Sequence, residues 1–136
     1  MTVINLNTFS FGQLISFNGS DLYINKLEKG DTLQISIEFY INRGTEMENI
    51  SIYKNETGSF FALIKCNNMK AETIELTSSE LNALKLFEEK IRNQCLKSNI
   101  PIYIHSLAKY EIKYKGRLIA YSTKNEFYSL CEEFKK

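Results

Sequence analysis

The sequence predicts an α+β protein that forms a single domain over residues 1–136. Its expected order is an antiparallel β-meander of about six strands, a long amphipathic helix, then a strand, a β-hairpin and a short C-terminal helix. Three observations predict this order. Turn-forming clusters recur at intervals of roughly ten to twelve residues in the first half. Helical periodicity begins at Thr77, and strand-like alternation returns after Pro101.

The meander is expected between Phe9 and about Leu76, where apolar stretches alternate with clusters of turn-forming residues. Asn18-Gly19 is the sharpest turn, because both residues tolerate the positive φ angles of a type I′ turn. The segments between the clusters are interpreted as successive strands. The clusters are FNGS (17–20), EKGD (28–31), NRGTEME (42–48), NETG (55–58) and NNMK (67–70).

Two of these strands differ in their pattern. TLQISIEFYI, residues 32–41, alternates apolar and mainly polar residues, which predicts one face in the core and one in water. SFFALIKC, residues 59–66, is apolar at consecutive positions up to Ile64. That pattern favours a central strand that is covered on both faces.

The long helix is predicted from Thr77 to about Lys97. Thr77-Ser78-Ser79-Glu80 is a capping box, and an apolar stripe follows it at helical spacing. The pairs Lys85 with Glu89 and Glu88 with Arg92 are spaced four residues apart, and we expect both on the outer, solvated surface. The stripe consists of Leu81, Leu84, Phe87 or Glu88, Ile91 and Cys95.

After Pro101 a strand is expected with Ile100, Ile102 and Ile104 on one face and Tyr103 and His105 on the other. The segment KYEIKYKGRLIAYS, residues 109–122, predicts a hairpin with its turn at Lys115-Gly116. The cross-strand pairs expected on one face are Tyr114 with Arg117, Ile112 with Ile119, and Tyr110 with Tyr121; the other face carries Lys113 with Leu118 and Glu111 with Ala120.

Most of this hairpin is interpreted as a core surface, with only its tip left for contacts. At the tip, the Arg117 guanidinium is expected to lie on the Tyr114 ring. Thr123-Lys124-Asn125-Glu126 is a second capping box, which predicts a short terminal helix that folds back on the hairpin. The apolar stripe of that helix is Phe127, Leu130, Cys131 and Phe134.

The charge balance excludes two classes of protein. Seventeen basic and sixteen acidic residues give a net charge of +1, which suits neither a polyanion mimic of nucleic acid nor a strongly basic duplex binder. Basic charge is mostly lysine, and the abundance of Ile, Asn and Glu indicates an AT-rich genome, such as that of a low-GC bacterium or its phage.

The expected location is the cytoplasm. The amino-terminal residues show no signal-peptide pattern, and no apolar run reaches about eighteen residues, so no membrane association is expected. Cys66, Cys95 and Cys131 are odd in number and contain no CxxC pair. This favours a reducing compartment with inert thiols, and it argues against a disulfide framework or a zinc site.

The sequence gives little support for an enzymatic function. His105 is the only histidine, and no neighbouring pattern supplies the partners that a general base or metal ligand needs. Glu111-Ile112-Lys113 matches the E-x-K part of metal-dependent nucleases, but the upstream acidic residue that such sites need is missing. We therefore expect no catalytic residue, metal ion or cofactor.

By elimination, the predicted function is a small non-enzymatic binding protein, such as an inhibitor or immunity-type protein of a phage or mobile element that blocks a partner protein. A homodimer is a further expectation, because an open sheet edge must be covered or paired. The alternative is a protein that binds a nucleotide, another small molecule or single-stranded RNA through the 103–117 region. The candidate binding residues are Tyr40, Arg43, Tyr53, Tyr103, His105, Lys113, Tyr114, Lys115 and Arg117.

Overall fold

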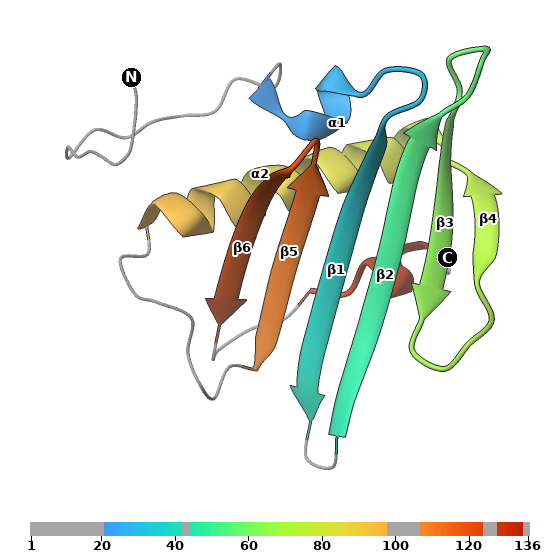
Figure 1. The fold of residues 1–136 in the computed structure, drawn as a ribbon. Coiled ribbons are helices and arrows are strands. Elements are labelled where there is room, and N and C mark those ends of the chain that lie inside the picture. The colour runs from blue at the N-terminus through green and yellow to red at the C-terminus, as the bar shows by residue number, and fades with distance from the viewer. Residues whose placement is uncertain (1–20, 42–43, 98–106, 124–127, 135–136) are drawn as a thin grey trace.

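The computed structural model describes residues 21–41, 44–97, 107–123 and 128–134, and they form a two-layer α+β fold (Figure 1). The predicted fold class is confirmed. The elements are α1 (Tyr23–Lys26), β1 (Thr32–Ile41), β2 (Gly44–Lys54), β3 (Phe60–Cys66), β4 (Glu72–Glu75), α2 (Ser78–Lys97), β5 (Ala108–Tyr114), β6 (Arg117–Thr123) and α3 (Leu130–Phe134).

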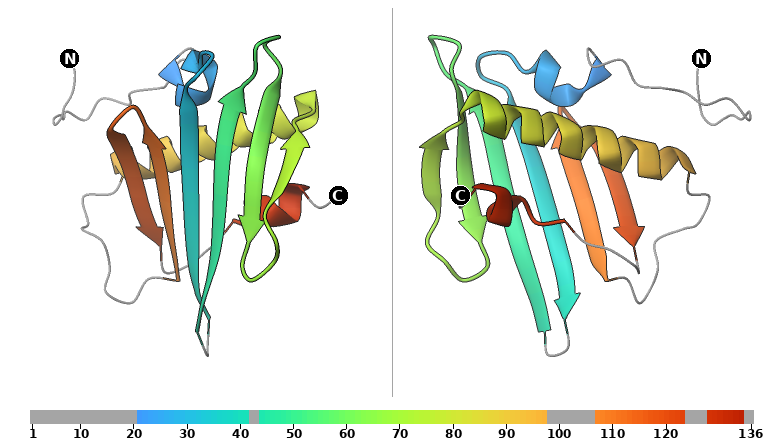
Figure 2. Two further views of the ribbon diagram at one scale, coloured as in Figure 1. Left: turned by 45° about the vertical axis from the view of Figure 1, so that its right-hand side comes forward. Right: turned by 180° about the vertical axis from the view of Figure 1, so that it is seen from behind.

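The six strands form one antiparallel sheet in the order β4-β3-β2-β1-β5-β6. Strands β1 to β4 follow one another as neighbours, and the chain then crosses behind the sheet through α2 and returns with β5 beside β1 (Figure 2). Four of the strands therefore precede the long helix and two follow it. The helical turn α1 occupies a segment where the turn spacing predicted a strand.

Two predictions on the first half need correction. Most of NRGTEME is strand rather than loop, because Gly44 to Glu48 pair with the far end of β1 and so lengthen the hairpin. SFFALIKC is not covered on both faces: β3 lies one strand from the sheet edge, and the Leu63 side chain remains 43% exposed. The second apolar face of β3 therefore lies at the protein surface.

The core lies between the sheet and α2. The expected alternation of β1 holds, because Leu33, Ile35 and Ile37 are buried beneath the helical layer. From α2, Leu84, Phe87 and Ile91 pack into the same cluster, as the helical stripe predicted.

The predicted capping box begins α2 as expected. The Thr77 amide donates to Glu80 Oε1 at 2.8 Å, and the Glu80 amide donates to Thr77 Oγ1 at 3.1 Å. Each side chain thus satisfies an amide that lacks a partner within the helix.

The β5–β6 hairpin has the predicted register. Lys115 and Gly116 have φ angles of 47° and 77°, as the two central residues of a type I′ turn require. Tyr110 lies opposite Tyr121, and their rings stack with centroids 6.2 Å apart. The turn chemistry and the strand period therefore fix which side chains face the core.

The Glu88–Arg92 pair is buried and does not lie on the solvated surface that the sequence predicted. Glu88 is only 2% exposed, and its carboxylate accepts the Tyr23 amide at 2.6 Å and the Ile24 amide at 3.1 Å. Arg92 Nε donates to the same carboxylate at 2.8 Å, and its guanidinium lies 4.3 Å from the Tyr23 ring centroid. The pair therefore joins α2 to the start of α1, where amides attract negative charge.

A second buried carboxylate holds α3. Glu48 of β2 accepts the Cys131 amide at 3.1 Å and a hydrogen bond from the Ser129 hydroxyl. The terminal helix returns to the helix-bearing face of the sheet, as predicted, but it lies behind β2 and β3 (Figure 2). Contact with the hairpin comes from the Tyr128 amide, which donates to the Tyr110 hydroxyl at 2.7 Å. Residues 124–126 of the second capping box lie outside the described residues.

Replacement of Glu88 tests the attachment of α1. We expect Glu88→Ala to lower the free energy of unfolding by about 3 to 5 kcal/mol, because two backbone amides and a guanidinium would lose a buried acceptor. Urea unfolding followed by circular dichroism measures the change. The matched control is Glu89→Ala on the same helix turn, for which we expect a change of less than about 0.5 kcal/mol. Equal losses for both variants would contradict this account.

Candidate functional site

The main candidate surface is the sheet face that points away from α2, which no described helix covers (Figures 1 and 2). We call it the open face. In an antiparallel sheet, residues paired across strands share a face, so the register identifies its members. They are Thr32, Gln34, Ser36, Glu38 and Tyr40 of β1; Thr45, Met47, Asn49, Ser51 and Tyr53 of β2; Phe61, Leu63 and Lys65 of β3; Thr73 and Glu75 of β4; Lys109, Glu111 and Lys113 of β5; and Leu118, Ala120 and Ser122 of β6.

Apolar side chains gather on the β2–β3 part of this face. The rings of Tyr53 and Phe61 stack with centroids 5.9 Å apart and planes 16° apart. Leu63 follows two residues along β3 on the same face, and Met47 of β2 is also exposed. Both rings are partly exposed, and partly exposed aromatic side chains beside exposed aliphatic ones are typical of a protein contact.

The open face has no net charge among its described residues, since Lys65, Lys109 and Lys113 balance Glu38, Glu75 and Glu111. The acidic and basic side chains nevertheless follow a definite order across the strands. One row across the sheet reads Glu111, Ser36, Asn49, Lys65, with the acid on β5 and the base on β3. In the middle of this row, Ser36 Oγ donates to Asn49 Oδ1 at 3.1 Å.

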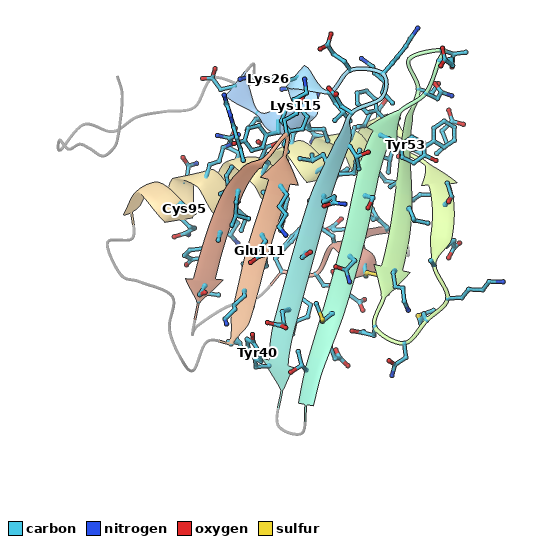
Figure 3. The ribbon with its side chains drawn as sticks, in the orientation of Figure 1. Lys26, Tyr40, Tyr53, Cys95, Glu111 and Lys115 are labelled. Carbon is cyan, nitrogen blue, oxygen red and sulfur yellow. A yellow bond between two sulfur atoms is a disulfide. The ribbon has the colours of Figure 1, made fainter. Side chains whose placement is uncertain are left out.

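Figure 3 places two predicted binding residues on the open face: Tyr40 near the lower end of β1 and Tyr53 near the upper end of β2. The Tyr40 hydroxyl donates to the Glu38 carboxylate, and Lys109 Nζ lies 5.5 Å from the ring centroid. The bond to Glu38 raises the pKa of Tyr40 above its usual value, because it favours the protonated hydroxyl. Arg43, Tyr103 and His105 lie outside the described residues.

The contacts at the hairpin tip show which of its side chains are structural. Tyr114 is buried: its hydroxyl lies 3.1 Å from the Lys26 carbonyl oxygen and 3.0 Å from Asp31 Oδ2, so its single proton faces two acceptors. Lys115 Nζ lies 5.4 Å from the Tyr114 ring centroid and 3.4 Å from Asp31 Oδ2. Arg117, which the sequence placed on this ring, is exposed. Tyr114 therefore anchors the hairpin to the segment that precedes β1.

A hollow of about 290 Å³ lies beside this turn and brings together four of the predicted residues, Lys113, Tyr114, Lys115 and Arg117. The residues that complete its lining are Thr32, Gln34, Gly116 and Leu118, which were not predicted. Only the cross-strand register places Gln34 beside Lys113, so no local sequence pattern would have found it.

The E-x-K residues Glu111 and Lys113 lie on β5 with their side chains on the open face. Within the described ranges, no group of three His, Cys, Asp or Glu side chains is close enough to hold a metal ion. The neighbours of Glu111 across the strands are Ser36 and Ala120. The described part of the chain thus gives Glu111 no acidic cross-strand neighbour.

The cysteines depart from the prediction. Cys66 of β3 and Cys131 of α3 form a disulfide with their Cα atoms 6.1 Å apart. The bond closes a loop over a sequence separation of 65, which is worth about 4 kcal/mol if its effect is on the entropy of the unfolded chain. Disulfides are typical of oxidising compartments, so the cysteines do not support the predicted reducing one.

Cys95 is the free cysteine of the described chain, and its side chain is half-buried against the core, on the apolar stripe that the sequence predicted. Its Sγ donates to the Ala120 carbonyl at 3.0 Å. Burial raises the pKa of Cys95 to about 11, with the nearby Arg92 acting in the opposite direction.

Comparison of the chain with models of known protein families and with curated proteins finds no match. Among the described residues, no helix is both long enough and apolar enough to cross a membrane.

Alkylation tests the cysteine assignment. In the unfolded chain without reductant, we expect iodoacetamide to label one cysteine, Cys95, and after reduction to label all three. In the native protein at pH 8, Cys95 should react at least tenfold more slowly than in the unfolded chain, because its raised pKa and burial suppress the thiolate. Peptide mass spectrometry identifies the labelled positions. Labelling of Cys66 or Cys131 without reductant would disprove the bond.

Acid titration tests the Asp31 cluster. The Glu28 amide is the main cause that lowers the pKa of Asp31 below 3.8. A carboxylate with a lowered pKa stabilises the fold above its unfolded value and loses this effect as the pH falls through the folded value. We therefore expect Asp31→Asn to lower the urea midpoint at pH 7 and to lower it less at pH 3. The control is Asp21→Asn, at an exposed position; the same pH-dependent loss there would contradict the assignment.

Proposed function

We propose that this chain is a non-enzymatic protein-binding domain that holds its partner on the open face. The observation that carries the proposal is the one-sided arrangement of the fold: within the described ranges, α1, α2 and α3 all lie on one face of the six-stranded sheet, and no helix covers the other. That face combines the stacked pair Tyr53 and Phe61 with exposed Leu63 and balanced charges. Such a composition suits a mixed apolar and polar protein interface.

The size of the open face supports a protein partner. Six strands at about 4.8 Å spacing span roughly 29 Å, and the eight residue steps from Thr32 to Tyr40 span about 27 Å. The face therefore offers up to roughly 780 Å². This is close to the ~800 Å² that each partner contributes to a standard protein interface.

The hollow at the hairpin tip supports a second candidate function. Lys113, Lys115 and Arg117 surround it, and cations around a hollow suit the phosphate of a nucleotide or of single-stranded RNA. We favour the protein partner for two reasons. Lys115 is already paired with Asp31, and the open face beside the hollow has no excess of positive charge to attract a polyanion.

A domain of this kind acts by covering a surface of its partner. We infer an inhibitor or immunity-type protein, encoded by a phage or a mobile element, whose effect is to exclude other molecules from the partner. The contact residues of this proposal are Tyr53, Phe61 and Leu63 at the apolar end and Lys113 at the hairpin end.

A matched pair of leucine substitutions tests the open face. Leu63→Lys changes the open face, and Leu86→Lys changes a leucine of α2 that is 58% exposed. We expect tagged Leu63→Lys to retain at least tenfold less partner protein than wild type from a lysate of the source cells, because a charge would face the apolar contact. Quantitative mass spectrometry of the retained proteins measures this.

The control defines the outcome. Leu86→Lys should retain the same proteins as wild type, and both variants should keep the wild-type melting temperature within about 3 °C. Equal retention by the two variants would contradict binding at the open face. Material that absorbs at 260 nm and is lost with Lys113→Ala would instead support the nucleotide or RNA candidate.

A further inference from the structure

We propose that the open face binds a second copy of this chain, in a symmetric dimer whose two sheets pack face to face with their strands aligned. The inference rests on the proposed function, since it needs the open face to be a protein-binding surface. What selects a second copy among protein partners is the order of the charges on that face.

The row Glu111, Ser36, Asn49, Lys65 carries this argument. Its centre lies between β1 and β2, with the acid one strand out on β5 and the base one strand out on β3. A twofold axis in the interface, parallel to the strands and between β1 and β2, places each Glu111 opposite the other copy's Lys65. The same operation places Ser36 opposite Asn49. The row is therefore complementary to its own copy, as an interface between identical surfaces must be.

The charge pattern also disfavours the other twofold axis that keeps the strands of the two copies aligned. A twofold axis that runs along the row, perpendicular to the strands, would place Glu111 on Glu111 and Lys65 on Lys65. Like charges in an interface cost several kcal/mol. Aligned packing of two sheets is moreover one of the two geometries that sheets adopt, with strand directions within about 30° of each other.

One of the two neighbouring rows agrees with the axis parallel to the strands. It reads Lys113, Gln34, Ser51, Leu63 across the same four strands. The axis places Gln34 opposite Ser51, two side chains that can exchange a hydrogen bond. It also places the aliphatic stem of Lys113 over the other copy's Leu63, where the stem covers apolar surface and the ammonium reaches water.

The distances allow the central ion pairs. Glu111 and Lys65 each lie about 7 Å from the axis, and packed sheets are about 10 Å apart. A lysine and a glutamate side chain together span this gap. Lys65 Nζ already donates to the Asn67 carbonyl at 3.2 Å and the Met69 carbonyl at 2.7 Å, which leaves the third ammonium hydrogen for a carboxylate. Both copies together would bury up to roughly 1,560 Å², within the range of stable protein interfaces.

Charge reversal provides the test. The full chain carrying Glu111→Lys, and separately the full chain carrying Lys65→Glu, should each dimerise at least tenfold more weakly than wild type, because both ion pairs become repulsive. An equimolar mixture of the two variants should form a heterodimer with a dissociation constant within about threefold of wild type, because both pairs become attractive again. Native mass spectrometry with one variant labelled with ¹⁵N counts the mixed dimer, and sedimentation velocity gives the dissociation constants.

The mixture also controls for folding, since a variant that has merely lost the Lys65 bonds to its turn would not recover when mixed. Lys85→Glu, on an exposed position of α2, should leave the wild-type dissociation constant unchanged. A wild-type chain that is monomeric at 100 µM overturns the inference, as does a dimer that neither reversal weakens. If the wild-type chain is monomeric but Leu63→Lys still reduces the amount of captured partner protein, the dimer is wrong and the proposed function stands.

Discussion

Two buried carboxylates hold the short helices α1 and α3 in the helical layer, on the side of the sheet where α2 packs. Glu88 of α2 accepts the first amides of α1, and Glu48 of β2 accepts the Cys131 amide at the start of α3. Both helices are too short to be stable alone, so their position depends on these long-range contacts. The Cys66–Cys131 bond adds a covalent tie between α3 and β3 on the same side. With every described helix held there, no described helix covers the opposite face.

The sequence predicted the parts of the fold that depend on local period and turn chemistry. Strict alternation located β1 at residues 32–41, and Lys115-Gly116 determined the register of the last hairpin. The burial of the Glu88–Arg92 pair could not be predicted in this way. Its spacing of four residues is the same on a buried and on an exposed helix face, and α1 was not expected beside it. The disulfide could not be predicted either, because it depends on the position of α3 beside β3, which no local sequence pattern specifies.

The candidate site was predicted in part, because the residue types were recognised but not their surroundings. Lys113, Lys115 and Arg117 do meet at one hollow, while Tyr114 proved to be a buried anchor whose hydroxyl faces two acceptors. The apolar run in SFFALIKC was noticed but assigned to burial on both faces. Phe61 and Leu63 instead lie on the open face, so the excess of apolar residues marks a surface. Sequence alone could not separate these cases, since the strand order decides how much of β3 is covered.

The two proposals constrain each other, because a second copy and a different partner would use the same open face. In the proposed dimer, Glu111 and Lys65 are paired, so a partner must displace the other copy before it can bind. Its apparent affinity then falls as the concentration of this chain rises and the dimer becomes populated, since only the monomer is competent to bind. A partner that presents its own base opposite Glu111 and its own acid opposite Lys65 would replace both ion pairs at once. The order of charge along this row is therefore the feature that a true partner must match.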